Sequence, residues 1–412
     1  MAAKRSSTII PFLPMAPRIK IYFENGALAL ANAPADGVFG MLCTGVSVAT
    51  TFELAKPYVL RGLDSLVPLG VTAVNNAALY RVVSQFYAEA GNGVELWIMA
   101  FPDTVAMSAM LDVTDATKGK ALVNAANGRL RGLIVSRTPA SGYAGTTTNG
   151  LDADVTLAIA AGQALATWAT DTKFAPLFVL LDGYGYTGNP VDLTDLTMGS
   201  ADRVAVALGS QLSGEKRSIV ALAGGRLAKI GVHRNIARVA DGPVATVTSF
   251  IGTTPTERAD WESVSDKGYL VLRTYANRSG YFFTDDPTAT LATSDYSHLT
   301  ARRTIDKAYR IAYNVMLDKL MSEVAVNEDG TLQTGMAKSW QADVERAIAA
   351  NMTANGELSA NPSNPNDTGV TCFIDPAQNA VSSSRVKVSL RVRPFGYARY
   401  IDVYLGFQVT GK

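Results

Sequence analysis

The chain has 412 residues, a net charge of +1 and 48% hydrophobic residues. This length and composition predict a large core divided over two or three domains. The near-neutral charge, without a basic block that could neutralise phosphates, argues against a nucleic-acid partner. Cys43 and Cys372 lie in apolar or strand-like sequence and are interpreted as buried free thiols. With only two histidines, His233 and His298, we expect no histidine-based metal site and no cofactor.

The first 17 residues predict an extended arm rather than a helix, because three prolines fix the backbone and remove N–H donors. Their apolar run is too short and too broken for a signal peptide or a membrane helix. No later stretch reaches membrane length. We therefore expect no membrane insertion, and synthesis and assembly in the bacterial cytoplasm.

Two terminal segments alternate between apolar and polar residues, as a strand with one apolar face does. The first, 18–24, ends at the turn signal Asn25-Gly26. The second, 398–412, follows a turn at 394–397, which itself follows an alternating run at 385–393. The apolar residues of these predicted strand arms are Ile19, Ile21 and Phe23 in the first, and Ile401, Val403, Leu405, Phe407 and Val409 in the second.

Residues 26–240 switch repeatedly between helical and strand patterns. Strands separated by helices are typical of an α/β layer with a mostly parallel sheet. The predicted helices span 76–90, 152–170 and 201–212, and the predicted strands span 94–99, 130–136, 177–181 and 218–223.

The last third has a different texture. Residues 241–298 combine Thr, Gly and Asp with short β-like runs, which predicts a β-rich connecting region. A helix over 299–324 keeps one face apolar, and a second helix spans 337–352. Turn-forming residues fill 355–369 before the strand at 385–393. Together these elements predict an α+β domain over 299–397.

Several segments resemble nucleotide-binding motifs. Gly183 to Gly188 spell G-x-G-x-x-G after a strand, but a dinucleotide site needs the third glycine inside the first turn of a helix. Asn189-Pro190 follows at once, so we interpret this loop as a glycine-rich turn. The strand ending at Asp182 resembles a Walker B strand, yet no phosphate-binding loop accompanies it.

Acidic and basic residues that could be catalytic are likewise interpreted as structural. Asp285-Asp286, like Asp152 and Asp154, could be paired carboxylates, but nothing in the sequence places a base beside them, and solvated loop charge is favoured. His233 could be a base, and is interpreted instead as a histidine at a domain or subunit junction. The segment from Ala223 to Arg226 is interpreted as a turn between a strand and a helix.

The terminal strands leave unpaired edges unless another strand covers them. They could pair within the subunit or add to a neighbour's sheet. Burying the five apolar residues of the C-terminal arm contributes roughly 7 to 15 kcal/mol, and association costs roughly 4 to 15 kcal/mol. One donated strand is therefore marginal, whereas two per subunit, repeated through a lattice, would hold firmly.

In order and spacing, these segments resemble contractile tail sheath proteins of phages, pyocins and related injection systems, in a compact version. The resemblance implies a mixed-sheet α/β core, a C-terminal α+β domain, and extended N- and C-terminal strand arms, with 1–25 and 398–412 as the arms. The matching segments are 78–97, 220–228, 232–239, 302–313, 340–358 and 386–409.

The resemblance also implies a function. Such subunits stack, in hexameric rings, around an inner tube, donate their arms to neighbours, and contract to drive the tube through a target envelope. Implied partners are further copies of the chain, the tube protein, and baseplate and tail terminator proteins, in a virion tail or an injection particle. No nucleotide is required, so no enzymatic activity is expected. The second helix offers candidate tube-facing residues: Lys338, Asp343, Glu345 and Arg346.

Two alternatives stay open. Another phage tail or baseplate component would form a closed ring and never a long tube. A nucleotide-binding α/β enzyme would use the loop at Gly183.

Overall fold

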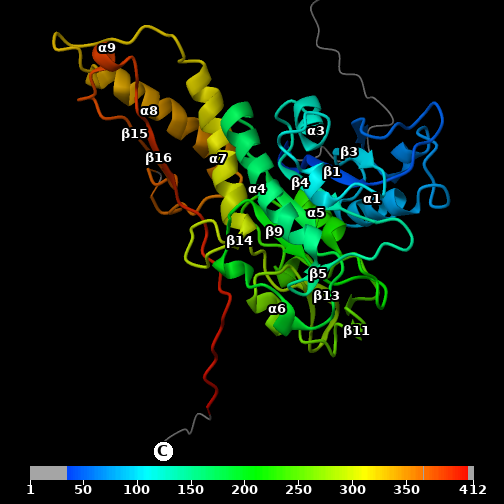
Figure 1. Ribbon diagram of the computed structural model, residues 1–412. Coiled ribbons are helices and arrows are strands. Elements are labelled where there is room, and N and C mark those ends of the chain that lie inside the picture. The colour runs from blue at the N-terminus through cyan, green and yellow to red at the C-terminus, as the bar shows by residue number, and fades with distance from the viewer. Residues whose placement is uncertain (1–34, 365, 407–412) are drawn as a thin grey trace, which may run out of the picture.

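The computed structural model describes residues 35–364 and 366–406, and a six-stranded sheet forms its centre (Figure 1). The strands lie in the order β2-β3-β1-β4-β7-β9, with β2 antiparallel to β3 and all other neighbours parallel. The five parallel strands therefore follow the doubly wound order 2-1-3-4-5. This arrangement confirms the predicted mixed, mostly parallel sheet. The strands are β1 (Phe39–Thr44), β2 (Tyr58–Leu60), β3 (Leu96–Phe101), β4 (Gly132–Ser136), β7 (Phe178–Asp182) and β9 (Val204–Ala207).

Both faces of the sheet are covered, which explains why its strands read as nearly continuous apolar runs. Helices α1 (Ala77–Ala90) and α5 (Val220–Lys229) pack on one face and enclose the first core. Helices α2 (Met107–Met110), α3 (Gly119–Ala125) and α4 (Ala153–Lys173) enclose the second core on the other face. The predicted helix at 152–170 begins where expected, because the Asp152 side chain accepts a hydrogen bond from the Asp154 N–H at 3.0 Å.

Two predicted elements in the middle region are wrong. Most of the strand expected at 218–223, from Val220 onward, and the whole turn expected at 223–226 belong to helix α5. Its paired glycines are packing residues: a Cβ on Gly225 would lie 2.3 Å from the Phe86 carbonyl oxygen, and one on Gly224 would lie 2.2 Å from Ile134. Close contact with α1 and the sheet thus overrides the low helix propensity of glycine.

The helix expected at 201–212 is also absent. Its place is taken by β8 (Ser200–Ala201) and β9, whose four residues are all buried. A short apolar run such as Val204–Ala207 does not distinguish a buried strand from a buried helix by periodicity. Here the strand forms because these residues pair in parallel with β7 at the edge of the sheet.

Residues 241–298 pack onto this body. Leu270 and Phe283 belong to the core that α1 and α5 enclose, and Ala207 forms a bridge with Leu270. The region contains β10 (Phe250–Ile251), β11 (Thr254–Pro255), α6 (Trp261–Asp266), β12 (Leu272–Tyr275), β13 (Arg278–Phe283) and β14 (Ala289–Thr290). Short elements elsewhere are β5 (Thr147–Thr148), β6 (Leu151–Asp152), and 3-10 turns at Ala35–Gly37, Leu63–Leu66, Pro190–Asp192, Leu196–Met198 and Val239–Asp241.

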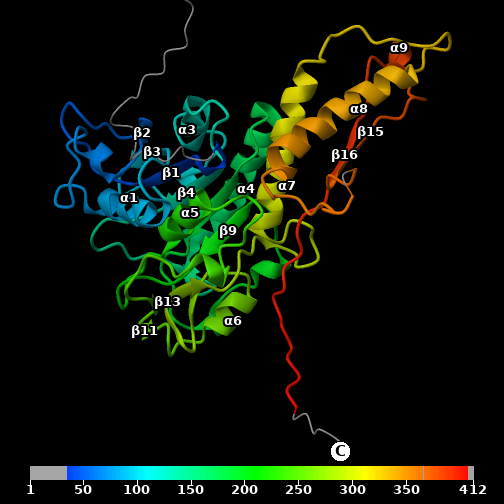
Figure 2. The ribbon, with the colours of Figure 1, turned by 180° about the vertical axis from the view of Figure 1, so that it is seen from behind.

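The C-terminal region projects from the body along α7 (Leu299–Leu317), as Figures 1 and 2 show. Helix α8 (Thr334–Ile348), which a π-turn at Ala349–Thr353 extends, lies beside α7. A hairpin-like pair of strands, β15 (Val370–Phe373) and β16 (Ser389–Val392), completes this smaller core, with α9 (Ala380–Ser383) between them. The two predicted helices are present, but α7 ends seven residues earlier than expected, at 317 rather than 324.

Buried ion pairs fasten α7 to the body. Asp306 accepts from Arg203 at 3.0 Å and from Arg302 at 2.8 Å, and all three side chains are less than a tenth exposed. Lys307 and Arg310 both reach Asp36, at 2.6 and 3.0 Å. Removing one partner of such a pair leaves a buried charge uncompensated, so these contacts fix the position of α7.

Within the described part of the chain, no helix is long and apolar enough to cross a membrane.

Candidate assembly surfaces

Residues 398–406 leave the body as an extended segment without a strand partner among the described residues (Figure 1). Ile401, Val403 and Leu405 are 76%, 78% and 97% exposed. Exposed apolar patches are candidate interaction sites, and these three aliphatic side chains at alternate positions form an exposed apolar row. The other predicted arm residues, Phe407 and Val409, lie outside the described residues, as do Ile19, Ile21 and Phe23.

The predicted strand at 385–393 is shorter than expected, and sequence analysis missed its partner. Only 389–392 form β16, which pairs antiparallel with β15. One face of this pair, with Cys372 and Leu390, packs against α7 and α8. The outer edges of β15 and β16 have no further strand partner within 35–364 and 366–406. On the β15 edge, the backbone of Cys372 is already engaged by α8, since its N–H donates to Glu345 at 2.7 Å and its carbonyl accepts from Gln341 at 2.8 Å. The edge of β16 therefore offers the backbone groups that can pair with an added strand.

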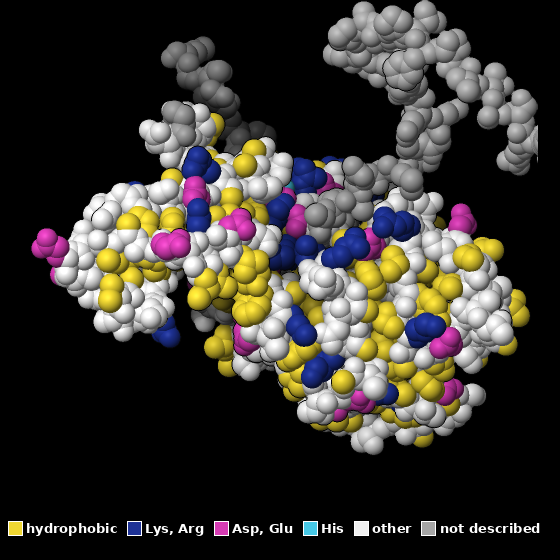
Figure 3. All heavy atoms as spheres, turned by 90° about the horizontal axis from the view of Figure 1, so that it is seen from above, with side chains coloured by type: hydrophobic (Ala, Val, Ile, Leu, Met, Phe, Trp, Pro, Cys, Tyr) yellow, Lys and Arg dark blue, Asp and Glu magenta, His cyan; other side chains and the backbone are white. Residues whose placement is uncertain are grey.

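Helix α8 carries the four predicted tube-facing residues, but they do not form one exposed set. Lys338 and Arg346 are exposed. Asp343 accepts hydrogen bonds from Lys319 and Arg346, both at 2.7 Å, and the bond from Lys319 lowers the pKa of Asp343. Glu345 accepts from the backbone N–H of Cys372 at 2.7 Å and so positions β15. On the face in Figure 3, basic and acidic side chains likewise lie side by side.

The loop at Gly183 has the geometry of a turn. The strand β7 ends at Asp182, and the first helical residues beyond the glycines form only the three-residue turn Pro190–Asp192. The N–H of Gly183 donates to the Ala207 carbonyl at 2.9 Å, and that of Gly185 to the Lys216 carbonyl at 2.7 Å. These N–H groups are thus engaged within the protein and do not point at a phosphate position.

The carboxyl edge of the sheet, where doubly wound proteins bind ligands, is occupied by paired side chains. Asp182 is fully buried and accepts from the Ser136 hydroxyl at 2.8 Å and the Ser218 N–H at 2.7 Å. Burial raises the pKa of Asp182. Arg217 is paired with Glu215 at 2.6 Å. The resemblance of this strand to a Walker B strand therefore has a structural explanation, which is hydrogen bonding across the strand ends.

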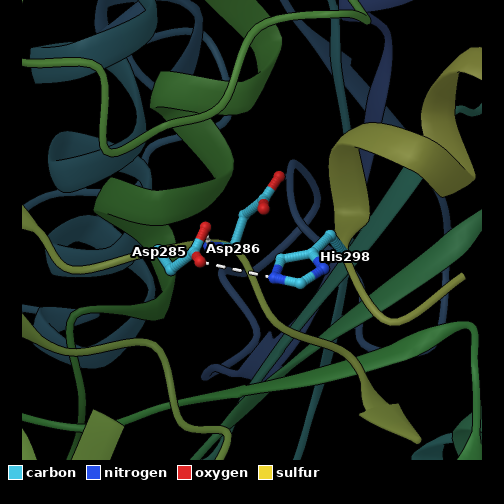
Figure 4. Close-up of side chains that lie close together, drawn as sticks. All are labelled: Asp285, Asp286 and His298. Atoms are coloured by element: carbon cyan, nitrogen blue, oxygen red, sulfur yellow. Dashed lines mark hydrogen bonds and ion pairs between the residues drawn. The ribbon is translucent and has the colours of Figure 1, made fainter. Parts of the chain in front are cut away.

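The pair Asp285-Asp286 is the main site that sequence analysis misjudged. Asp286 is fully buried, so the interpretation as solvated loop charge is wrong. His298, at the start of α7, lies beside it, with Nε2 3.3 Å from Asp285 Oδ2 (Figure 4). Arg399, from the root of the C-terminal arm, donates to the same Asp285 oxygen at 2.6 Å.

Asp285, Asp286 and His298 lie close enough together to be considered as metal ligands, since one ligand atom from each falls within 4.8 Å of the others. Their oxygens, however, already accept from N–H donors. Asp286 accepts from the Thr300 N–H at 2.8 Å and from the Asn235 amide at 2.8 Å, and Asp285 accepts from Asn235 at 2.5 Å. A guanidinium in contact with Asp285 also repels a cation. The donor set fits a hydrogen-bonded cluster and does not fit a metal centre.

His233 lies where the body meets the C-terminal segment, as the sequence suggested. Its backbone carbonyl accepts from the Tyr397 hydroxyl, and its ring centroid is 5.7 Å from that of Phe395. Burial, helped by the nearby Arg234, lowers the pKa of His233. The ring Nδ1 has no hydrogen-bond partner among the described residues, so the ring packs at the junction while the backbone carbonyl bonds across it.

Comparisons with known proteins cover nearly the whole chain. Residues 16–287 match the family model described as DUF2586, N-terminal domain, and residues 295–412 match DUF2586, C-terminal domain. No curated protein matches. The helical sheath of the anti-feeding prophage in its contracted state is similar in structure, with a TM-score of 0.64 and 13% identity, over 96% of this chain and 100% of that one.

Two further solved structures are similar in fold to this chain. A chain of the six-fold symmetrised anti-feeding prophage baseplate gives a TM-score of 0.62 at 15% identity, over 96% of this chain and 100% of that one. A chain of the contracted sheath complex of the extracellular contractile injection system PVC gives 0.57 at 12% identity, over 97% and 99%. The resemblance to sheath proteins that the sequence suggested is confirmed at the level of the fold. This chain belongs to the DUF2586 family, and its fold is that of contractile sheath proteins.

Proposed function

We propose that this protein is the structural subunit of a contractile sheath, which polymerises as stacked rings around an inner tube and contracts to drive that tube through a cell envelope. The observation that carries the proposal is that one chain contains both an exposed apolar arm and a small sheet whose β16 edge is open among the described residues. The likeness in fold to the contracted anti-feeding prophage sheath, over nearly the whole of both chains, supports it.

The arm and the sheet suggest how subunits connect. Residues 398–412 of one subunit add a strand beside β16 in the sheet of a neighbour, and residues 1–25 of another subunit supply a second strand that extends this sheet. Backbone hydrogen bonds then give connection, and the alternate apolar side chains give affinity. Because the strands are tethered through extended segments, subunits can rotate relative to one another without separating. The energy of contraction is stored at assembly and requires no nucleotide.

The remaining partners follow from this role. Lys338 and Arg346 of α8 are proposed to face the inner tube, where exposed charge pairs of about 0 to 1 kcal/mol each allow weak holding and release. Baseplate and tail terminator proteins would cap the two ends of the lattice. The finished particle is a virion tail or an injection particle assembled in the bacterial cytoplasm.

Electron microscopy of the purified full-length protein tests the proposal. Long tubes or stacked rings are expected, and deletion of 398–412 should leave a folded subunit that no longer polymerises. If the truncated protein still forms tubes at the same concentration, strand donation by this arm is refuted. Closed rings that never extend into tubes would favour a baseplate role, which the likeness to a baseplate chain keeps as the second candidate.

A further inference from the structure

The root of the C-terminal arm is docked on its own subunit before the arm becomes exposed. Residues 395–400 form one wall of a groove of about 970 Å³ between the body and the C-terminal region. The Tyr397 hydroxyl donates to the His233 carbonyl, and the Arg399 guanidinium contacts Asp285. Immediately beyond Arg399, Tyr400 is 91% exposed. Arg399 is therefore the last residue by which the described part of the arm is held to its own subunit.

The carboxylate that receives Arg399 has an acidic neighbour. Asp285 and the fully buried Asp286 are adjacent in sequence and share the amide donor of Asn235. Asp286 is also bound at the start of α7, where the N–H and the hydroxyl of Thr300 donate to it. The body thus fixes both carboxylates, and the arm contributes only the cation.

Two adjacent carboxylates oppose each other's ionisation. Burial opposes the charge of Asp285, but hydrogen bonds from His298 and Arg399 outweigh it and hold the pKa of Asp285 well below its usual range. Burial, with the charge of Asp285, raises the pKa of Asp286 to about 7. Arg303 of α7 and the Tyr397 hydroxyl also face the pair, and His233 and Arg234 line the same groove.

The sign of the coupling follows from these contacts. When Arg399 leaves, Asp285 loses a cation and its pKa rises, so the undocked state binds more protons than the docked state. By linkage, acidification then favours undocking. Docking is therefore complete above the ordinary aspartate pKa near 4, and it weakens as the pH falls below that value toward the lowered pKa of docked Asp285.

We propose that Asp285 and Asp286 form a proton-linked socket for Arg399, which docks the root of the C-terminal arm on its own subunit and releases it as the pH falls. The socket fixes the direction in which the arm leaves its own subunit. It therefore favours a neighbouring subunit that lies in that direction. The inference rests on the proposed function only for the destination of the arm.

A nitroxide spin label at residue 398 tests the socket. Ala398 is exposed, while Cys43 and Cys372 are 1% and 3% exposed, so an Ala398→Cys variant takes the label at one position. Full-length subunits are kept dispersed and folded, as sedimentation and circular dichroism verify, and label mobility is measured from pH 8 to pH 3. We expect an immobilised label at pH 8 and a docking constant that falls by up to about tenfold per pH unit, the limit for one linked proton.

Three variants separate the parts of the proposal. Arg399→Gln should leave the label mobile at every pH, and Asp285→Asn, which removes the carboxylate that takes up the proton, should abolish the change of mobility with pH. Arg393→Gln is the matched control, because it removes the same charge from the exposed pair with Asp367, at 2.7 Å, and should change nothing.

The proposal is overturned if Arg399→Gln and the parent protein show the same mobility at pH 8. It is also overturned if mobility in the parent protein does not change between pH 8 and pH 3, or if Asp285→Asn keeps that change. Tube formation is scored separately by electron microscopy. A protein that docks its arm but never forms tubes would refute the sheath proposal and leave the socket standing.

Discussion

The exposed side chains of the C-terminal arm give the sharpest test of strand donation. Ile401, Val403 and Leu405 are at least three-quarters exposed in the subunit, so replacing all three with serine should leave its stability unchanged. On a neighbour's sheet each buried side chain contributes roughly 1.5 to 3 kcal/mol, and the triple variant loses roughly 5 to 9 kcal/mol per subunit. This loss is comparable to the whole cost of association, roughly 4 to 15 kcal/mol.

The assay is the critical concentration for assembly, measured by sedimentation and checked by electron microscopy. Since about 1.4 kcal/mol corresponds to a factor of ten, we expect it to rise at least about a thousandfold. A double variant, Val74→Ser with Val247→Ser, is the matched control, because both residues are 94% exposed apolar side chains on the body rather than the arm. The control should assemble like the parent protein.

The reasoning fails in either of two ways. If the triple variant assembles at the parental concentration, the arm does not bury these side chains on a neighbour. If thermal unfolding of the dispersed triple variant shifts by several degrees, the three side chains stabilise the subunit itself, and the arm is not free as the structure shows.

Three further predictions concern the subunit alone. Gly225→Ala should lower the free energy of unfolding by about 1 to 3 kcal/mol in urea, whereas Gly335→Ala, whose Cβ would have open space, should be neutral or stabilising; equal effects would contradict the close approach of α5 to α1. Asp306→Ala should cost about 3 to 5 kcal/mol, because two buried arginines lose their partner, against at most about 1 kcal/mol for Arg346→Gln at the exposed pair. Burial raises the pKa of the Cys43 thiol to about 12, so this thiol should resist iodoacetamide at pH 8 until urea unfolds the protein, as mass spectrometry of the alkylated chain would show.

Sequence pattern was sufficient to predict the elements that depend on residues close together in the chain. The helix at 77–90 was predicted within one residue at its start because tyrosines and valines recur at helical spacing before a glycine stop. The strands at 132–136 and 178–182 were predicted because buried parallel strands are apolar on both faces. The order and spacing of such segments also carried the resemblance to sheath proteins, which the fold confirmed.

Long-range packing decided the rest. Glycines disfavour a helix in isolation, and only the approach of α5 to Phe86 and Ile134 makes Gly224 and Gly225 necessary in one. Likewise, the sequence by itself showed two adjacent aspartates in a loop, but not that His298 and Arg399, 12 and 113 positions further on, converge on them. Sequence thus determined the elements whose periodicity is local and the apolar alternation of the arm. The tertiary structure decided which charges are buried together and where the arm leaves the subunit, because burial and ion pairing depend on contacts between distant segments.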